Sequence, residues 1–95
     1  MFEYLLILKS CANPDLGQST TPAPAVVKTV HSLAAAGRAA RAYIETHELG
    51  AGNWAGGPII DIETGAVVGR VSYNGRVWDL NGVCLFDPFT GGADG

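Results

Sequence analysis

Apolar residues recur at alternate positions in several short runs, a pattern typical of β-strands. Residues 1–10, "MFEYLLILKS", carry apolar side chains on both alternating sets, so we expect a strand that is buried on both sides near the centre of a sheet. Residues 25–31, "AVVKTVH", predict a second strand. The runs between residues 58 and 86, separated by Gly-containing turns, predict an antiparallel meander.

After residue 32 the spacing of apolar residues changes from alternate positions to the period of a helix. Ser32 is a suitable N-cap residue, and we expect a helix from about residue 33 to 48 with Gly50 as its C-cap. One face of this helix is expected to pack against the sheet, and it consists of Leu33, Gly37, Ala40, Ile44 and His47. Arg38, Arg41, Glu45 and Glu48 form the opposite face.

Three dipeptides in the meander favour tight turns, and they are Thr64-Gly65, Asn74-Gly75 and Asn81-Gly82. Read as two-residue turns, all three agree on one strand register. This register predicts an inward set of Ile60, Ile62, Val67, Val71, Trp78, Leu80, Val83 and Leu85. It places an outer set on the other side of the sheet, with Ile59, Val68, Val77 and Phe86 among Asp61, Glu63, Arg70, Ser72 and Asp79.

These elements predict the α+β fold class: an antiparallel β-sheet of four to six strands with one α-helix (about 32–48) packed on one face, in the order ββαββββ. A chain of 95 residues is long enough for one domain, so residues 1–95 are expected to share one core. Residues 11–24 are rich in Pro, Gly, Asn, Ser and Thr and predict a flexible loop, and residues 87–95 predict a loose C-terminal tail.

Composition narrows the classes of function. Hydrophobic residues make up 47% of the chain and charged residues 16%, which is typical of a folded protein. Nine acidic and six basic residues give a formal charge of −3, which argues against direct nucleic-acid binding and favours a protein partner. The longest apolar stretch is too short for a membrane span and no secretory signal is evident, so we expect a cytoplasmic protein.

No residue pattern predicts a cofactor or a metal. Cys11 and Cys84 lack CxxC spacing, and the acidic residues near the end of the chain lack the spacing of a calcium loop. Asp61 and Glu63 lie two apart on one strand, which would suit paired-carboxylate chemistry if His31 or His47 folded close to them. An exposed acidic pair that keeps a sheet soluble is the simpler interpretation.

The outer face of the meander is the more promising binding surface, because one helix covers only one face of a sheet. The alternative is that the N-terminal segment or the tail covers this face. Tyr43, Trp54 and Tyr73 are further candidate anchors, since aromatic residues with a polar tip are common among interface hot spots. The residues expected to contact a partner are Asp61, Glu63, Arg70, Tyr73, Arg76 and Asp79.

The order of elements, together with "D-x-x-T-G-x-x-x-x-R-V-S-Y-N-G-R-V-W" at residues 61–78, resembles small accessory proteins of bacterial mobile elements, among them some anti-CRISPR inhibitors. The resemblance covers about residues 25–79. It implies a non-enzymatic inhibitor from a phage or plasmid that blocks a CRISPR-Cas or other nucleoprotein complex by steric occlusion in the bacterial cytoplasm. The alternatives are a small ligand-binding or hydrolytic domain that uses Asp61 and Glu63, and a structural module that self-associates into a homodimer through an edge strand.

Overall fold

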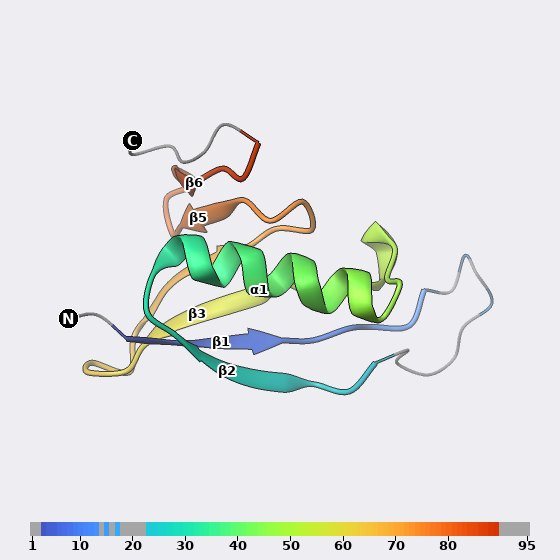
Figure 1. Cartoon of the computed structure of the whole chain (residues 1–95), viewed down its shortest axis with the longest axis horizontal. Helices are drawn as coiled ribbons and strands as arrows, with labels where there is room; N and C mark the ends of the chain where they lie inside the picture. The colour runs from blue at the N-terminus through green and yellow to red at the C-terminus, as the bar shows by residue number, and fades with distance from the viewer. Residues whose placement is uncertain (1–2, 14, 16, 18–22, 90–95) are drawn as a thin grey trace.

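The computed structural model describes residues 3–13, 15, 17 and 23–89, which form an antiparallel sheet with a helix along one face (Figure 1). The sheet has six strands in the spatial order β2-β1-β3-β4-β5-β6. The elements in chain order are β1 (Tyr4–Leu8), β2 (Val26–Val30), α1 (Leu33–Thr46), the short 3₁₀ helix η2 (Ala51–Asn53), β3 (Gly57–Asp61), β4 (Val67–Val71), β5 (Val77–Asp79) and β6 (Cys84–Phe86). The predicted α+β class and the antiparallel meander are therefore confirmed.

Helix α1 begins where the sequence predicts. The Ser32 side chain accepts a hydrogen bond from the backbone N–H of Ala35 at 3.0 Å, which satisfies one of the donors left open at a helix N-terminus. The helix ends at Thr46, and the residue with a left-handed backbone is Glu48, at φ +52°, so the prediction of Gly50 as the C-cap is wrong. Tyr43, expected to be an interface anchor, is instead buried on the sheet side of the helix.

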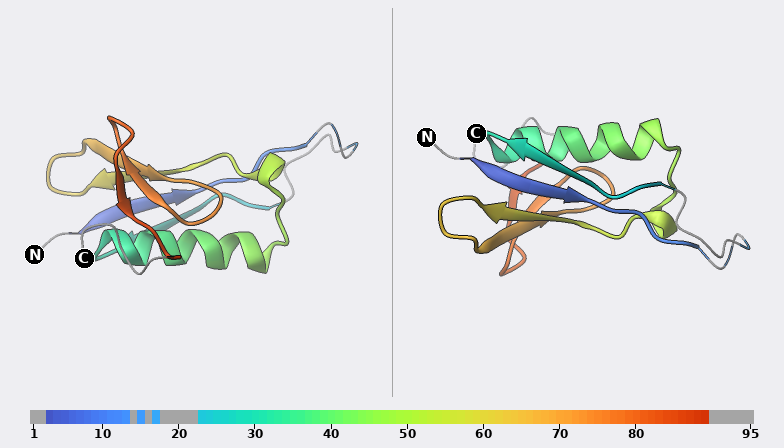
Figure 2. Two further views of the ribbon diagram at one scale, coloured as in Figure 1. Left: turned by 90° about the horizontal axis from the view of Figure 1, so that it is seen from above. Right: turned by 90° about the horizontal axis from the view of Figure 1, so that it is seen from below.

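The core lies between α1 and one face of the sheet (Figure 2). Tyr43 donates a hydrogen bond from its hydroxyl to the Pro24 carbonyl at 2.7 Å, so its polar tip is satisfied while its ring is buried. Trp54 packs near Tyr43 and donates to the Val71 carbonyl at 3.0 Å. The largest fully buried side chains are Leu6, Leu8, Ile44, Ile59, Val71 and Val77.

The hairpin loops are longer than the sequence analysis predicts. Ser72 pairs with Arg76 across a three-residue loop, and Asp79 pairs with Val83 across another. A two-residue type I′ turn needs positive φ at both of its central residues. Gly75 and Gly82 adopt positive φ, at +88° and +82°, whereas the asparagines before them do not. Each loop is therefore a turn followed by one left-handed glycine, which demands only one such residue.

This change of loop length corrects the predicted faces of the last strands. Val71 pairs with Val77, and Val77 pairs with Phe86, so these residues share the helix-facing side of the sheet. A shift of one residue moves a side chain to the opposite face of a sheet. Val77 and Phe86, predicted to face outward, are in the core, and so is Ile59 of β3, which precedes these loops. Residues predicted to face inward but found exposed are Ile62, Val67, Leu80 and Val83.

The β3–β4 connection differs from its prediction as well. Residues 62–65 form a four-residue loop between Asp61 and Ala66, whose backbones are hydrogen-bonded at 2.9 Å. The register of the two strands then shifts between Ile59 and Ile60. Ile62 lies in this loop and not in a strand, which explains why it does not join the core.

Strand β1 is not buried on both sides as predicted. Leu6 and Leu8 are buried under α1, whereas Leu5 and Ile7, on the opposite face of the strand, remain partly exposed. The expectation of a central strand is met only in part, because β1 lies between β2 and β3 at one side of the sheet. A single helix covers a single face, and among the described residues no second layer lies over the other.

Both segments predicted to be mobile lie partly outside the described residues. Within the predicted loop 11–24, Ala23 is buried and exchanges two hydrogen bonds with the Ser10 hydroxyl. Within the predicted tail 87–95, Asp87 is bound to Arg76, at 3.1 Å. The ends of both segments next to the sheet are therefore fixed, and the rest of the two predictions lies beyond the described part of the chain.

We expect Gly37→Ala to destabilise the fold, although alanine is the better helix former. A β-carbon at residue 37 would lie 2.5 Å from the Gly75 carbonyl oxygen and 3.0 Å from the Phe86 ring. Backbone cannot rotate away as a side chain can, so the helix and the β4–β5 loop must separate, at a cost of about 1–3 kcal/mol. Urea unfolding measures this cost. Arg38→Ala, at the next and exposed position, is the control, and a Gly37→Ala protein as stable as the wild type would contradict the expectation.

Candidate functional site

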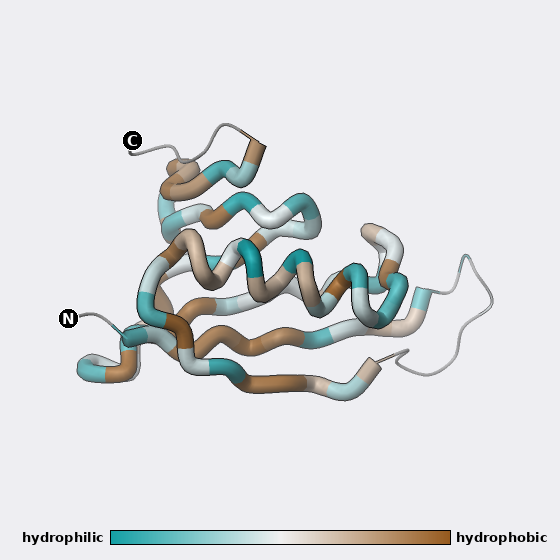
Figure 3. The backbone as a smooth tube through the Cα atoms, in the orientation of Figure 1, coloured by the Kyte–Doolittle hydropathy of each residue, from teal (hydrophilic) through white to brown (hydrophobic). Residues whose placement is uncertain are grey.

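The face of the sheet away from α1 is apolar, and its side chains are only partly buried by their neighbours on the same face. We define the open sheet face as Leu5, Ile7, Val27, Pro58, Ile60, Val67, Arg70 and Trp78. The register aligns Leu5 with Ile60 and Ile60 with Val67 in one row across three strands. Val27 and Val67 are 60% and 45% exposed. Figure 3 shows the apolar stretches along β1 and β2 that contribute to this face.

Trp78 and Arg70 form the aromatic and charged part of the open sheet face. They are direct partners across β4 and β5, and the Arg70 guanidinium lies 6.0 Å from the centroid of the Trp78 ring. An arginine in this position is attracted by the negative face of the indole. Arg70 forms no ion pair with a described residue, in contrast to Arg41 and Arg76. Its charge is therefore available to a carboxylate from outside.

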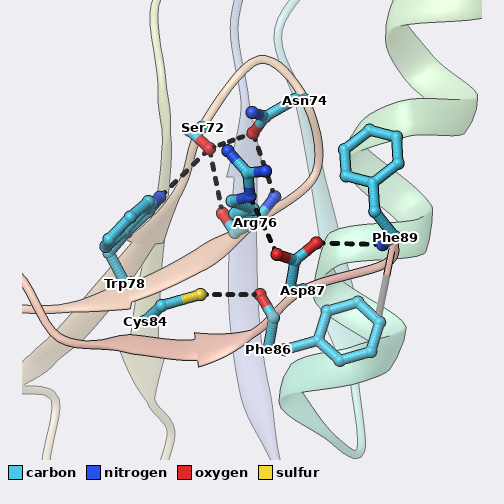
Figure 4. A network of polar contacts seen from close by, with 8 residues as sticks. All are labelled: Ser72, Asn74, Arg76, Trp78, Cys84, Phe86, Asp87 and Phe89. Carbon is cyan, nitrogen blue, oxygen red and sulfur yellow. Dashed lines mark hydrogen bonds and ion pairs between the residues drawn. The ribbon is translucent and has the colours of Figure 1, made fainter. Parts of the chain in front are cut away.

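A polar network fixes the orientation of Trp78 (Figure 4). The indole N–H donates to the Ser72 hydroxyl at 3.1 Å. The Ser72 hydroxyl has one hydrogen and two possible acceptors, Asn74 Oδ1 at 2.6 Å and the Arg76 carbonyl oxygen at 3.2 Å. It donates to Asn74 Oδ1, because that contact is the shorter one. Trp78 thus has a restricted ring on a partly exposed face, which reduces the entropy lost on binding.

The same network attaches the segment after β6. Arg76 Nε donates to Asp87 Oδ2 at 3.1 Å, and Asp87 Oδ1 accepts from the Phe89 backbone N–H at 2.9 Å. The Arg76 guanidinium also lies 5.5 Å from the centroid of the Phe89 ring (Figure 4). Arg76, one of the predicted contact residues, already has a partner within the chain.

The structure divides the six predicted contact residues between two ends of the sheet. Successive hairpins of a meander turn at alternate ends. Asp61 and Glu63 lie at the β3–β4 loop and Asp79 at the β5–β6 turn, which share one end. Tyr73 and Arg76 belong to the β4–β5 loop at the other end, and Arg70 lies on β4 between these ends, on the open sheet face.

Asp61 and Asp79 stabilise the loops that they begin. Asp61 Oδ1 accepts a hydrogen bond from the Glu63 backbone N–H at 2.9 Å. Asp79 Oδ1 accepts two, from Asn81 at 2.8 Å and Val83 at 2.9 Å. An Asp side chain that binds backbone two residues later is a common turn-forming device. Both carboxylates therefore have a structural role in the loops that they begin.

Tyr73 faces the helix side of the molecule. Its hydroxyl donates to the Leu49 carbonyl at 3.1 Å, and the Arg41 guanidinium lies 5.2 Å from its ring centroid. Arg41 also donates to the Tyr73 carbonyl at 2.7 Å. Tyr73 therefore joins the β4–β5 loop to the helix and does not line the open sheet face.

The structure brings no histidine against the Asp61 and Glu63 pair. His31 Nδ1 lies 3.8 Å from Glu3 Oε2, and the His47 ring packs against Tyr43 beyond the C-terminal end of α1. Among the described residues, no group of three or more His, Cys, Asp or Glu side chains is arranged to hold a metal ion. None of the described helices is long and apolar enough to cross a membrane.

Sequence reasoning missed Leu5, Ile7, Ile60 and Trp78 as parts of an exposed face. The available signal was β1 itself, where both alternating sets are apolar although only one helix is predicted. Comparisons with protein-family models, curated proteins and solved structures returned no match for this chain. The arguments about function below therefore depend on its own residues.

Removing the Asp79 carboxylate is expected to cost more stability than removing that of Asp61. Each hydrogen bond contributes on the order of 1 kcal/mol, and Asp79 accepts two from backbone where Asp61 accepts one. Asp79→Ala should therefore lower the free energy of unfolding by about 1–2 kcal/mol, as measured by urea titration. The control is Glu63→Ala, whose exposed carboxylate accepts no hydrogen bond from a described residue. Equal stability of Asp79→Ala and Glu63→Ala would disprove the structural role.

Proposed function

We propose that the protein works by binding another protein through its open sheet face, without catalysis. The observation that carries this proposal is the row of partly exposed apolar residues beside the Trp78–Arg70 pair. Interface hot spots are enriched in Trp and Arg, and interface centres are depleted of other charges. Of the residues that define this face, Arg70 alone is charged.

The size of the face indicates that its rim also takes part. Four strands of five residues, each about 17 Å long, and the three-residue β5, about 10 Å long, at a spacing of about 4.8 Å present roughly 370 Å² in projection. A stable interface buries about 800 Å² on each partner, so the apolar face is large enough for the centre of an interface but not for all of it. The ends of the sheet supply a polar rim, which includes Asp61, Glu63 and Asp79 from the predicted contact set.

Self-association through the sheet edge is the less favoured mode. Strand β2 forms one edge, and Lys28 lies at its centre. Antiparallel pairing of two β2 strands about their centres would bring the two Lys28 side chains together, and a lysine on an edge strand is a common protection against such pairing. The face is therefore a better candidate interface than the edge.

The more specific function that we propose is the one that the resemblance implies, a small inhibitor encoded by a phage or plasmid. Such a protein would occlude a surface of a CRISPR-Cas or other nucleoprotein complex in the bacterial cytoplasm. A rigid face with one anchored Trp suits occlusion, because the binding residues are fixed before the partner arrives. The formal charge of −3 favours contact with the protein part of such a complex over contact with its nucleic acid.

An affinity pull-down from a bacterial lysate that contains defence complexes, with mass spectrometry, tests this function. The binding variant is Val27→Glu/Val67→Glu, which places two carboxylates on the open sheet face at positions already exposed. The matched control is Val83→Glu at the β5–β6 turn, where valine is 56% exposed. We expect the wild type and the control to recover a nucleoprotein complex at least about tenfold better than the binding variant, a difference of about 1.4 kcal/mol.

Equal recovery by all three proteins would rule out the open sheet face as the interface. Recovery of no protein partner by the wild type would contradict the binding function itself. Light scattering on the same three proteins separates a further case, in which the occupant of the face is a second copy of this chain and the binding variant alone loses the dimer.

A further inference from the structure

The two Asn-Gly turns have the same backbone form but different surroundings. In each, the glycine N–H donates to the carbonyl of the residue that opens the loop, at 2.9 Å for Gly75 and 3.2 Å for Gly82. Both glycines have positive φ of nearly the same value. Differences in the chemistry of Asn74 and Asn81 must therefore come from what surrounds them and not from the turn itself.

Asn74 is held by its neighbours. Its Oδ1 accepts from the Ser72 hydroxyl at 2.6 Å and lies 3.4 Å from the Arg76 backbone N–H. Gly75 is buried, and the Arg41 and Pro88 side chains lie against it. The Asn74 amide cannot rotate toward the following backbone nitrogen without breaking these contacts.

Asn81 has none of this support. Asn81 and Gly82 are both exposed, and the Asn81 side chain forms no hydrogen bond to a described residue. Apart from Gly82 and its two chain neighbours, no atom of the described residues lies within 4 Å of the position that a β-carbon of Gly82 would take. The turn joins β5 to β6, and its residues 80–83 are exposed, so the turn opens locally at little cost in free energy while Phe86 keeps β6 in the core.

We propose that Asn81 is a site of spontaneous modification, at which deamidation converts it to aspartate and isoaspartate while Asn74 stays intact. During a local opening, the Gly82 backbone nitrogen loses its proton and attacks the Asn81 side-chain carbonyl carbon. The C–NH₂ bond breaks, ammonia leaves, and a five-membered imide remains. Water then opens the imide at either carbonyl, so that the only reactants are the chain and water. Glycine permits this ring closure best because it has no side chain to obstruct it.

The products change the β5–β6 turn in two ways. Each adds a negative charge two residues from Asp79, whose Oδ1 accepts the Asn81 N–H in the unmodified chain. Isoaspartate also carries the main chain through the side-chain methylene and so lengthens a loop that pairs Asp79 with Val83 at 2.9 Å. The backbone pairing of Asp79 with Val83 that closes the turn then weakens, while Phe86 keeps β6 in the core. The modification thus loosens the β5–β6 turn as the protein ages.

Peptide mapping of the folded protein after prolonged incubation in mildly alkaline buffer at physiological temperature tests the proposal. Trypsin cleaves after Arg70 and Arg76, so residues 71–76 and 77–95 separate and each carries one Asn-Gly pair. We expect isoaspartate in the second peptide to form several-fold faster than in the first. Equal rates, or a faster rate at Asn74, would overturn the proposal.

Two controls assign the difference to the fold. In denaturant the two peptides should convert at similar rates, and a difference that persists there would attribute the selectivity to sequence and overturn the structural explanation. Ser72→Ala removes the hydroxyl that holds Asn74 and should raise its rate several-fold toward that of Asn81. In the isolated isoaspartate-81 protein the Asp79 amide should exchange its hydrogen faster, and an unchanged rate would refute the loosening of the β5–β6 turn.

Discussion

The left-handed glycine at the end of the β4–β5 loop, Gly75, is the constraint on which the rest of the structure depends. Gly75 and Gly82 place one extra residue in each loop relative to a two-residue turn. Side chains alternate along a strand with a period of two, so the extra residue before β5 decides which β5 residues face the helix. The extra residue before β6 is offset by a register shift between Val77 and Trp78, which pairs Val77 with Phe86. Val77 and Phe86 enter the core as a result, and Trp78 is directed to the opposite face.

The same loop also determines how closely the helix approaches. Gly37 of α1 lies against the Gly75 carbonyl and the Phe86 ring, which leaves no space for a side chain. Arg41 and Tyr73 then join helix and loop through a hydrogen bond and a cation–π contact. Helix α1, the β4–β5 loop and strand β6 therefore pack together as one unit, and the whole length of α1 lies on one face of the sheet. The other face keeps its partly exposed apolar residues and the oriented Trp78, on which the proposed interface is based.

The acidic residues illustrate how a fold can account for side chains that look functional in a sequence. Asp61, Asp79 and Asp87 each accept a backbone N–H two residues later, and each stands where a strand ends. The contribution of Asp61 and Asp79 to the rim of the proposed interface is therefore additional to their structural role. Arg70 differs from them, because its contact with Trp78 leaves its hydrogen-bond donors available.

The sequence by itself determined the elements and their order, because periodicity, the Ser32 cap and the Gly-containing turns are local signals that do not depend on distant residues. It predicted the α+β class, the meander, and the principle that one helix leaves one sheet face uncovered. It did not determine which side chains of β5 face the helix, since a turn of two or three residues looks the same in "YNG" and the choice reverses the side chains of β5. Only the tertiary structure decided this, through the packing of Val71, Val77 and Phe86 under α1 and the contacts of Gly75 with the helix.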